Sequence, residues 1–95
     1  MIRHIVLFSL KNREDMPRVV RILEGYRAIP QVRSLEVGVN QKLDTLSNEF
    51  DVALTVSFET VDDLEAYKQH AIYKAGTEVI RPLRDQRVVA DYEIG

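Results

Sequence analysis

The 95-residue sequence contains no cysteine and only two histidines. Without cysteine, disulfide bonds, thiolate nucleophiles and cysteine-based zinc sites are excluded, and a small domain then depends on packing or self-association for its stability. The histidines form neither an HExxH motif nor a histidine pair on one helix face, so we expect no metal and no other cofactor. The absence of cysteine also suits a reducing compartment.

Surplus basic charge and long hydrophobic runs are absent as well. Thirteen Lys and Arg against fifteen Asp and Glu give a formal net charge of -2, which provides no positive field for nucleic acid or anionic lipid. No apolar run reaches the ~20 residues that span a bilayer. The apolar start of the chain is interrupted by charge and lacks the small-residue cleavage site of a signal peptide. We therefore expect a cytoplasmic protein with no nucleic-acid and no membrane partner.

The composition favours a single globular domain that spans residues 1–95. The sequence is 45% hydrophobic and 29% charged, with only 4 Gly and 3 Pro, which is too apolar for a disordered chain. Six segments have the periodicity of a strand or a helix. In order they are a strand at 2–10, a helix at 15–29, strands at 33–40 and 51–58, a helix from Thr60 that breaks near His70 or Gly76, and a strand at 88–94.

The order βαββαβ predicts an α+β, ferredoxin-like fold, in which a four-stranded antiparallel sheet has both helices on one face. In the last strand we expect Val88, Ala90 and Tyr92 to lie under the helices. The uncovered face then mixes apolar side chains such as Leu7 with polar ones such as Asp91.

That mixture is too apolar for a fully hydrated face. The sequence therefore predicts a homodimer whose two sheets close into a barrel. A monomer with one semi-polar sheet face is the alternative, because antiparallel sheets often have a solvated side.

His4 is the first candidate for chemistry. It shares a strand face with Ile2, Val6 and Phe8, which would place the imidazole beneath the helices. A neutral imidazole in an apolar cavity can act as a general base. The same pattern also fits a core histidine that is satisfied by a structural hydrogen bond.

Tyr67, His70 and Tyr73 follow one another at intervals of three, so they lie on neighbouring parts of one helix face. Two phenols and an imidazole could bind carbonyl or hydroxyl groups of a ligand, and a phenol can support a developing oxyanion. A purely structural role for all three is the alternative. Neither the carboxylates of Asp91 and Glu93 nor the mixed-charge stretch at 81–87 is assigned a catalytic role.

At these residues the chain resembles the stress-responsive dimeric alpha/beta barrel family, known as the Dabb domain, over nearly its whole length. The matching features are residues 4–8, 34–40, 50–54 and 58–60, then Leu64, Tyr67 and His70, and finally 82–84 and 88–93. The resemblance implies the same fold and a homodimer with a central barrel. One plant group of the family cyclises a linear polyketide with two histidines and a tyrosine. His4 matches the first histidine, and Tyr67 matches the tyrosine.

The chain departs from the family at the second histidine region. Where the family commonly has His-Pro-x-His, this chain has His70, Ala71, Ile72 and Tyr73. The trailing histidine, which is the one implicated in cyclisation, is thus a tyrosine here. Tyrosine has an ordinary pKa near ~10 against ~6.5 for histidine, so Tyr73 is a poor proton acceptor at neutral pH.

Three functions fit these observations. The first is a homodimer that binds a small carbonyl-bearing or phenolic metabolite in a pocket between sheet and helices, contacted by His4, Tyr67, His70 and Tyr73. The second is a cofactor-independent enzyme, either cyclase-like or oxygenase-like, with His4 as general base and Tyr67 orienting a carbonyl. The third is a structural role in which assembly itself is the function. Whether the chain is an enzyme stays open at this point.

Overall fold

The computed structural model describes all residues, 1–95, and contains four strands and three α-helices. Their order is β1 (Ile2–Leu10), α1 (Met16–Glu24), β2 (Ser34–Val39), β3 (Val52–Phe58), α2 (Val61–Gln69), α3 (Ala71–Ile80) and β4 (Arg84–Glu93). Short 3₁₀ turns at Arg13–Asp15, Gly25–Ala28 and Arg81–Leu83 flank α1 and follow α3. The sequence predicted every strand and both helical regions.

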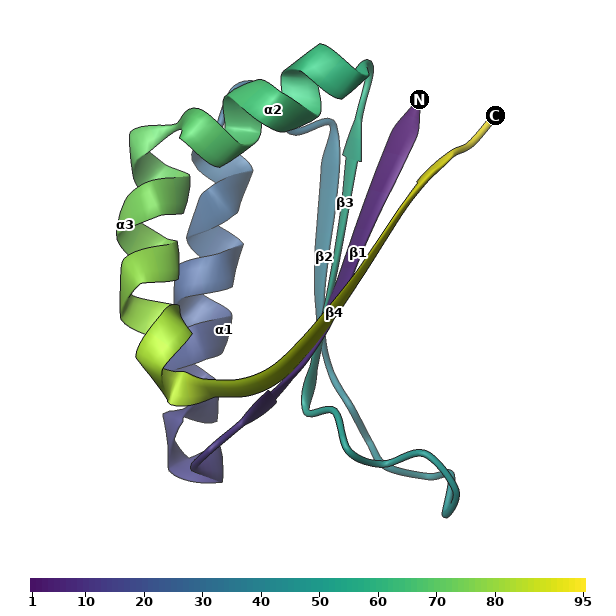
Figure 1. Ribbon diagram of the computed structural model, residues 1–95. Coiled ribbons are helices and arrows are strands. Elements are labelled where there is room, and N and C mark those ends of the chain that lie inside the picture. Colours follow the sequence, from purple (N-terminus) through teal and green to yellow (C-terminus); the bar gives the residue numbers. More distant parts are fainter.

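The strands form one antiparallel sheet in the order β2-β3-β1-β4. All three helices lie on the same side of this sheet, and the opposite side is bare (Figure 1). The ferredoxin-like fold is thereby confirmed. No helix has the length and apolarity needed to cross a membrane.

The structure locates the predicted helix break and moves one strand boundary. The second helical region breaks at His70, whose extended backbone ends α2 and whose ring caps the start of α3, while Gly76 lies inside α3. Strand β4 begins at Arg84 rather than Val88. Its first residues carry no alternating apolar pattern, and they join the sheet through pairing with the end of β1, where Leu10 lies opposite Arg84.

The hydrophobic core fills the layer between the sheet and the helices. Its buried members are Val6, Phe8, Leu10, Met16, Val19, Leu23, Tyr26, Ile29, Leu35, Val52, Leu54, Val56, Phe58, Leu64, Tyr67 and Ile80. Three of its four aromatic side chains, Tyr26, Phe58 and Tyr67, pack together and are almost fully buried. Tyr67 contacts the other two edge to face, which is a favourable arrangement for aromatic rings.

The faces of β4 are the reverse of those predicted. Leu7 lies opposite Val88 and Ile5 opposite Ala90, whereas His4 lies opposite Asp91. Because paired residues point to the same side of a sheet, Val88 and Ala90 belong to the bare face, and Asp91 lies under the helices beside His4. The alternation itself is confirmed, but alternation alone does not say which set of side chains faces the core.

The correction makes the bare face more apolar than expected. Its apolar residues are Ile5 and Leu7 of β1, Ala53 of β3 and Val88 and Ala90 of β4, with Thr55 of β3 opposite Ile5. Val88 is 49% exposed and Tyr92, further along the same face, is 43% exposed. Asp91 no longer contributes a charge to this surface.

Gly76 of α3 is held against α1 and the 3₁₀ turn that follows it. A Cβ atom at this position would lie 2.6 Å from the Tyr26 ring and 2.8 Å from Ile22. Tyr26 cannot give way easily, since it is 2% exposed and its hydroxyl contacts Thr77. Glycine is therefore required here for the close approach of the helical segments.

We expect Gly76→Ala to destabilise the protein. Alanine gains about 0.5–1 kcal/mol over glycine inside a helix, but forcing a methyl group into a filled site costs about 1–3 kcal/mol. The net loss of about 1–2 kcal/mol is measurable by thermal unfolding at one fixed protein concentration. Gly25→Ala is the matched control, because nothing lies within 4 Å of its added Cβ, and it should leave stability unchanged or raise it. Equal stability of the two variants would contradict the packing argument.

Candidate functional site

A small cavity lies between the helix-facing side of the sheet and the helices. Its lining residues are His4, Val6, Phe8, Leu23, Tyr26, Leu54, Tyr67, Tyr73, Thr77, Ile80, Arg84 and Arg87. The cavity has a volume of about 360 Å³ when its open mouth is included. Within it, the centre of a water molecule can occupy a volume of about 30 Å³ without touching the protein. That inner room holds on the order of two waters, so a larger ligand requires movement of side chains at the mouth.

His4 enters this cavity from the middle of β1, and its ring is held by the neighbouring strand. The imidazole is 2% exposed, and Nδ1 lies 2.5 Å from the Oδ1 atom of Asp91 on β4. Because the carboxylate accepts, Nδ1 donates, and the neutral ring carries its proton on Nδ1. Nε2 makes no hydrogen bond within the protein and retains its lone pair, so it is the nitrogen left for a ligand.

Burial lowers the pKa of the His4 imidazole below 6.5. The hydrogen bond and negative charge of Asp91 act in the opposite direction, and the positive charges of Lys68 and Arg87 lower the pKa further. Desolvation outweighs the stabilisation by Asp91. His4 is accordingly neutral at neutral pH, which is the state in which it can accept a proton.

The Tyr67 hydroxyl is the second polar group in the cavity. Tyr67 of α2 is 0% exposed, and its hydroxyl is buried without any hydrogen-bond partner. Burial is the main reason that its pKa is strongly raised, with the neighbouring phenols of Tyr26 and Tyr73 adding to the effect. Tyr67 is therefore a hydrogen-bond donor and not a base. Its ring meets that of His4 edge to face, with centroids 6.3 Å apart.

Of the other two sequence candidates, only one reaches the cavity. Tyr73 of α3 lines it, with its ring centroid 4.9 Å from that of Tyr67. His70 does not line it, because its Nδ1 accepts the backbone N–H of Ile72 at 3.1 Å and caps α3. The expected lining by three residues at intervals of three is thus incorrect for His70, since the helix ends there and a new one begins.

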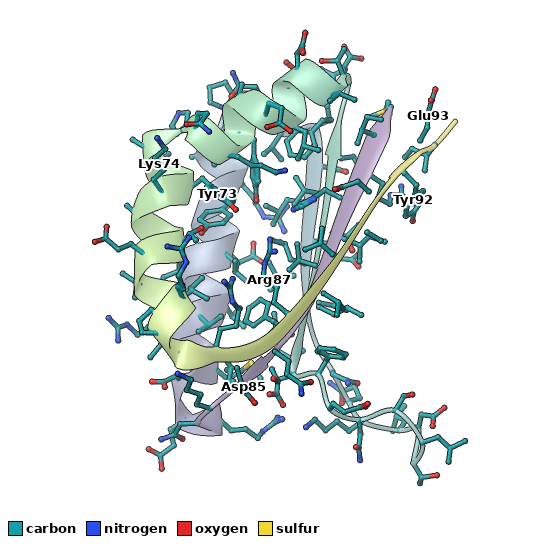
Figure 2. All side chains as sticks on the ribbon, viewed as in Figure 1. Tyr73, Lys74, Asp85, Arg87, Tyr92 and Glu93 are labelled. Carbon is teal, nitrogen blue, oxygen red and sulfur yellow. The ribbon has the colours of Figure 1, made fainter.

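Sequence reasoning missed three polar residues of the site, all from β4. The sequence predicts Asp91 on the opposite sheet face, and it predicts a solvated charged stretch at Arg84 and Arg87, yet both arginines line the cavity. Figure 2 shows Arg87 extending from β4 into the space between sheet and helices, towards the layer that holds Tyr73. A register argument could have found Asp91, because pairing β4 with β1 fixes which residue lies opposite His4.

The arrangement offers two chemical functions side by side. A neutral imidazole oriented by a carboxylate can accept a proton, and a phenol with a free O–H can donate a hydrogen bond to a carbonyl oxygen. No group of three or more His, Asp or Glu side chains suited to a metal ion is present.

Comparison with known proteins gives one family and a set of structural relatives. A family model described as the stress responsive A/B barrel domain matches residues 2–94. A dimeric ferredoxin-like protein of unknown function from Thermobifida fusca is 25% identical, with a TM-score of 0.87 over 98% of this chain and 90% of that chain. A dimeric protein of unknown function with a ferredoxin-like fold from Bacteroides fragilis is 26% identical, with a TM-score of 0.81 over 98% of this chain and 95% of that one.

More distant likenesses extend to enzymes. Hydroxynitrile lyase from Passiflora edulis is 19% identical, with a TM-score of 0.84 over 99% of this chain and 93% of that chain. At this identity the likeness shows the fold alone. No curated protein matches the chain.

Proposed function

The chain belongs to the stress-responsive A/B barrel domain family, and from that premise we propose that it is a homodimer which binds a small carbonyl-bearing or phenolic metabolite between sheet and helices. Each subunit provides one such site. The carbonyl or phenol oxygen of the ligand lies near Tyr67, and the carbon next to it lies near His4.

The homodimer is supported by the bare face of the sheet. Ile5, Leu7 and Val88 lie at the centre of that face, where a second copy can cover them. An apolar hollow next to Leu7, bounded by Phe50 and Ala53, continues the same surface towards the loop between β2 and β3. The Thermobifida and Bacteroides relatives are both described as dimeric.

The observation that carries the ligand proposal is the buried Tyr67 hydroxyl without a partner. Leaving a buried donor unsatisfied costs about 1–3 kcal/mol, and native structures rarely retain such groups without a reason. A ligand carbonyl or phenol oxygen in the adjoining cavity would satisfy it. The mainly apolar lining with a few convergent polar groups has the composition of a small-molecule site.

We expect 4-hydroxyacetophenone to bind in this cavity. NMR signals of the His4 and Tyr67 side chains should shift together and saturate with one dissociation constant. Tyr67→Phe should weaken binding about 10-fold, because one hydrogen bond contributes about 0.5–1.5 kcal/mol. Tyr92→Phe is the matched control on the bare face and should bind normally. Shifts scattered over the surface, or equal binding by both variants, would refute the assignment.

A second candidate function is favoured by the contact between His4 and Asp91. Any hydrogen-bond partner at one ring nitrogen would suffice for a purely structural histidine. Here the partner is the Asp91 carboxylate, which can only accept, so it fixes the tautomer that has its proton on Nδ1 and a free Nε2. Such a pair suits a cofactor-independent enzyme that removes a proton next to a carbonyl while Tyr67 stabilises the enolate oxygen. Tyr73 serves as a second donor, in the place where the plant cyclases of the family have a histidine.

A further inference from the structure

Two arginines at the mouth of the cavity have no anionic partner within the chain. Arg84 is partly buried and Arg87 is exposed, and both line the cavity that contains His4 and Tyr67. Neither takes part in an ion pair or a side-chain hydrogen bond, whereas Arg13, Arg27 and Arg33 each pair with a carboxylate.

An irregularity in the sheet brings these two arginines to the same face. Residues three apart in a regular strand point to opposite sides. Between the pairs Phe8–Arg87 and Leu10–Arg84 the register shifts, so that Asp85 and Gln86 together oppose Ser9. Phe8 and Leu10 both belong to the core, and their partners Arg84 and Arg87 therefore both lie on the helix side.

The nearest acidic residue along the strand does not neutralise them. Asp85 lies between the two arginines in sequence but lines a different hollow, together with Ser9, Arg13 and Asp51. Burial lowers the pKa of the Arg84 guanidinium, and the positive charges of Arg87 and Arg81 lower it further. The Arg84 guanidinium thus lies in an environment that disfavours its charge and that an anion would stabilise.

The approach to the cavity is also basic. Tyr73 and Thr77 line both the cavity and a neighbouring groove on α3. The groove is bordered by Lys68, Lys74 and Arg81, with Glu78 as its one acidic residue. In a chain of net charge -2, positive charge is therefore concentrated where a ligand would enter.

We propose that the ligand carries a carboxylate, which Arg84 and Arg87 bind at the mouth while the apolar body reaches towards His4 and Tyr67. The proposal rests on the proposed ligand site and adds the charge of the ligand to it. A guanidinium binds a carboxylate through two parallel N–H donors, and such charge-assisted hydrogen bonds are about twice as strong as neutral ones. The aromatic or aliphatic body of such a ligand also fits a cavity lined by Tyr26 and Tyr73.

The test compares 4-hydroxybenzoate with its neutral isostere 4-hydroxybenzamide. Both are titrated into the dimeric protein at millimolar concentration, with the His4 signals as the reporter of the cavity. We expect 4-hydroxybenzoate to bind at least about 10-fold more tightly, since one charge-assisted contact contributes about 1.5–3 kcal/mol. In the double variant Arg84→Gln, Arg87→Gln this preference should disappear, while 4-hydroxybenzamide binds as before.

The pair of substitutions Arg18→Gln and Arg21→Gln is the matched control, because it removes two positive charges at exposed residues of α1 that line neither the cavity nor the groove. It should keep the preference for 4-hydroxybenzoate. Equal binding of the two probes, or a preference that survives in the double variant, would overturn the carboxylate assignment and leave the ligand site standing. Inorganic phosphate that competes as strongly as 4-hydroxybenzoate would also overturn it, in favour of an unspecific anion site. If neither probe moves the His4 signals, the ligand site itself fails together with this inference.

Discussion

Leu7→Lys is expected to convert the homodimer into folded monomers. Leu7 lies on the bare face of β1, between Ala53 and Val88, and is only partly buried in the single chain. A lysine there reaches water in the monomer but is buried without a partner in the dimer. Burying an unpaired charge costs several kcal/mol, and a two-fold interface contains the substitution twice. We therefore expect the dimer dissociation constant to rise by at least about 10³-fold.

Sedimentation equilibrium measures this change directly. Val61→Lys is the control, because Val61 is an exposed apolar residue on α2, which lies on the covered side of the sheet, and it also changes from an aliphatic side chain to lysine. It should remain dimeric. A Leu7→Lys protein that is dimeric at the wild-type dissociation constant would show that the subunits associate through another surface.

His4→Gln is expected to abolish proton transfer if the chain is an enzyme. The probe reaction is exchange of the methyl protons of 4-hydroxyacetophenone for deuterium in D₂O, which requires removal of a proton next to the carbonyl. Wild-type protein should accelerate the exchange. A positioned general base contributes about 10²–10⁴-fold, and His4→Gln should lose that factor at saturating probe.

Asp91→Asn tests the orienting role separately. The amide keeps the shape of Asp91 but no longer selects the tautomer with its proton on Nδ1, because it can donate as well as accept and carries no negative charge. Exchange should slow while the affinity for the probe changes little, and the pKa of His4 should fall because the carboxylate raises it in the native protein. His70→Gln removes the capping histidine outside the cavity and should exchange at the wild-type rate. Undiminished exchange in His4→Gln would exclude His4 as the base.

The fold could be predicted from the sequence because its periods are distinct. Residues 33–40 and 51–58 alternate with a period of two. Thr60 marks the start of α2, because its hydroxyl accepts a hydrogen bond from the backbone N–H of Asp63. The sequence predicts a break near His70 or Gly76, and the structure has it at His70. The early start of β4 was not, because Arg84 and the residues after it owe their strand conformation to pairing with β1 rather than to their own pattern.

The site was predictable only in part. His4 and Tyr67 follow from their positions on an apolar strand face and an apolar helix face, both of which had to be covered. Asp91, Arg84 and Arg87 depend on the register of β4 and on the irregularity beside Ser9. Both are properties of strand pairing, so the sequence of β4 alone does not show that these polar side chains point under the helices.

The proposed site depends on His4 being a neutral base, held by Asp91, in an accessible cavity. A long-range ¹H–¹⁵N NMR spectrum of the His4 imidazole in the dimeric protein above pH 7, recorded with and without 4-hydroxyacetophenone, tests this assignment. The predicted result is a neutral ring protonated on Nδ1, with a free Nε2 whose signal moves when the probe binds. A charged ring, a proton on Nε2, or a spectrum that the probe leaves unchanged would contradict it and make His4 a structural residue.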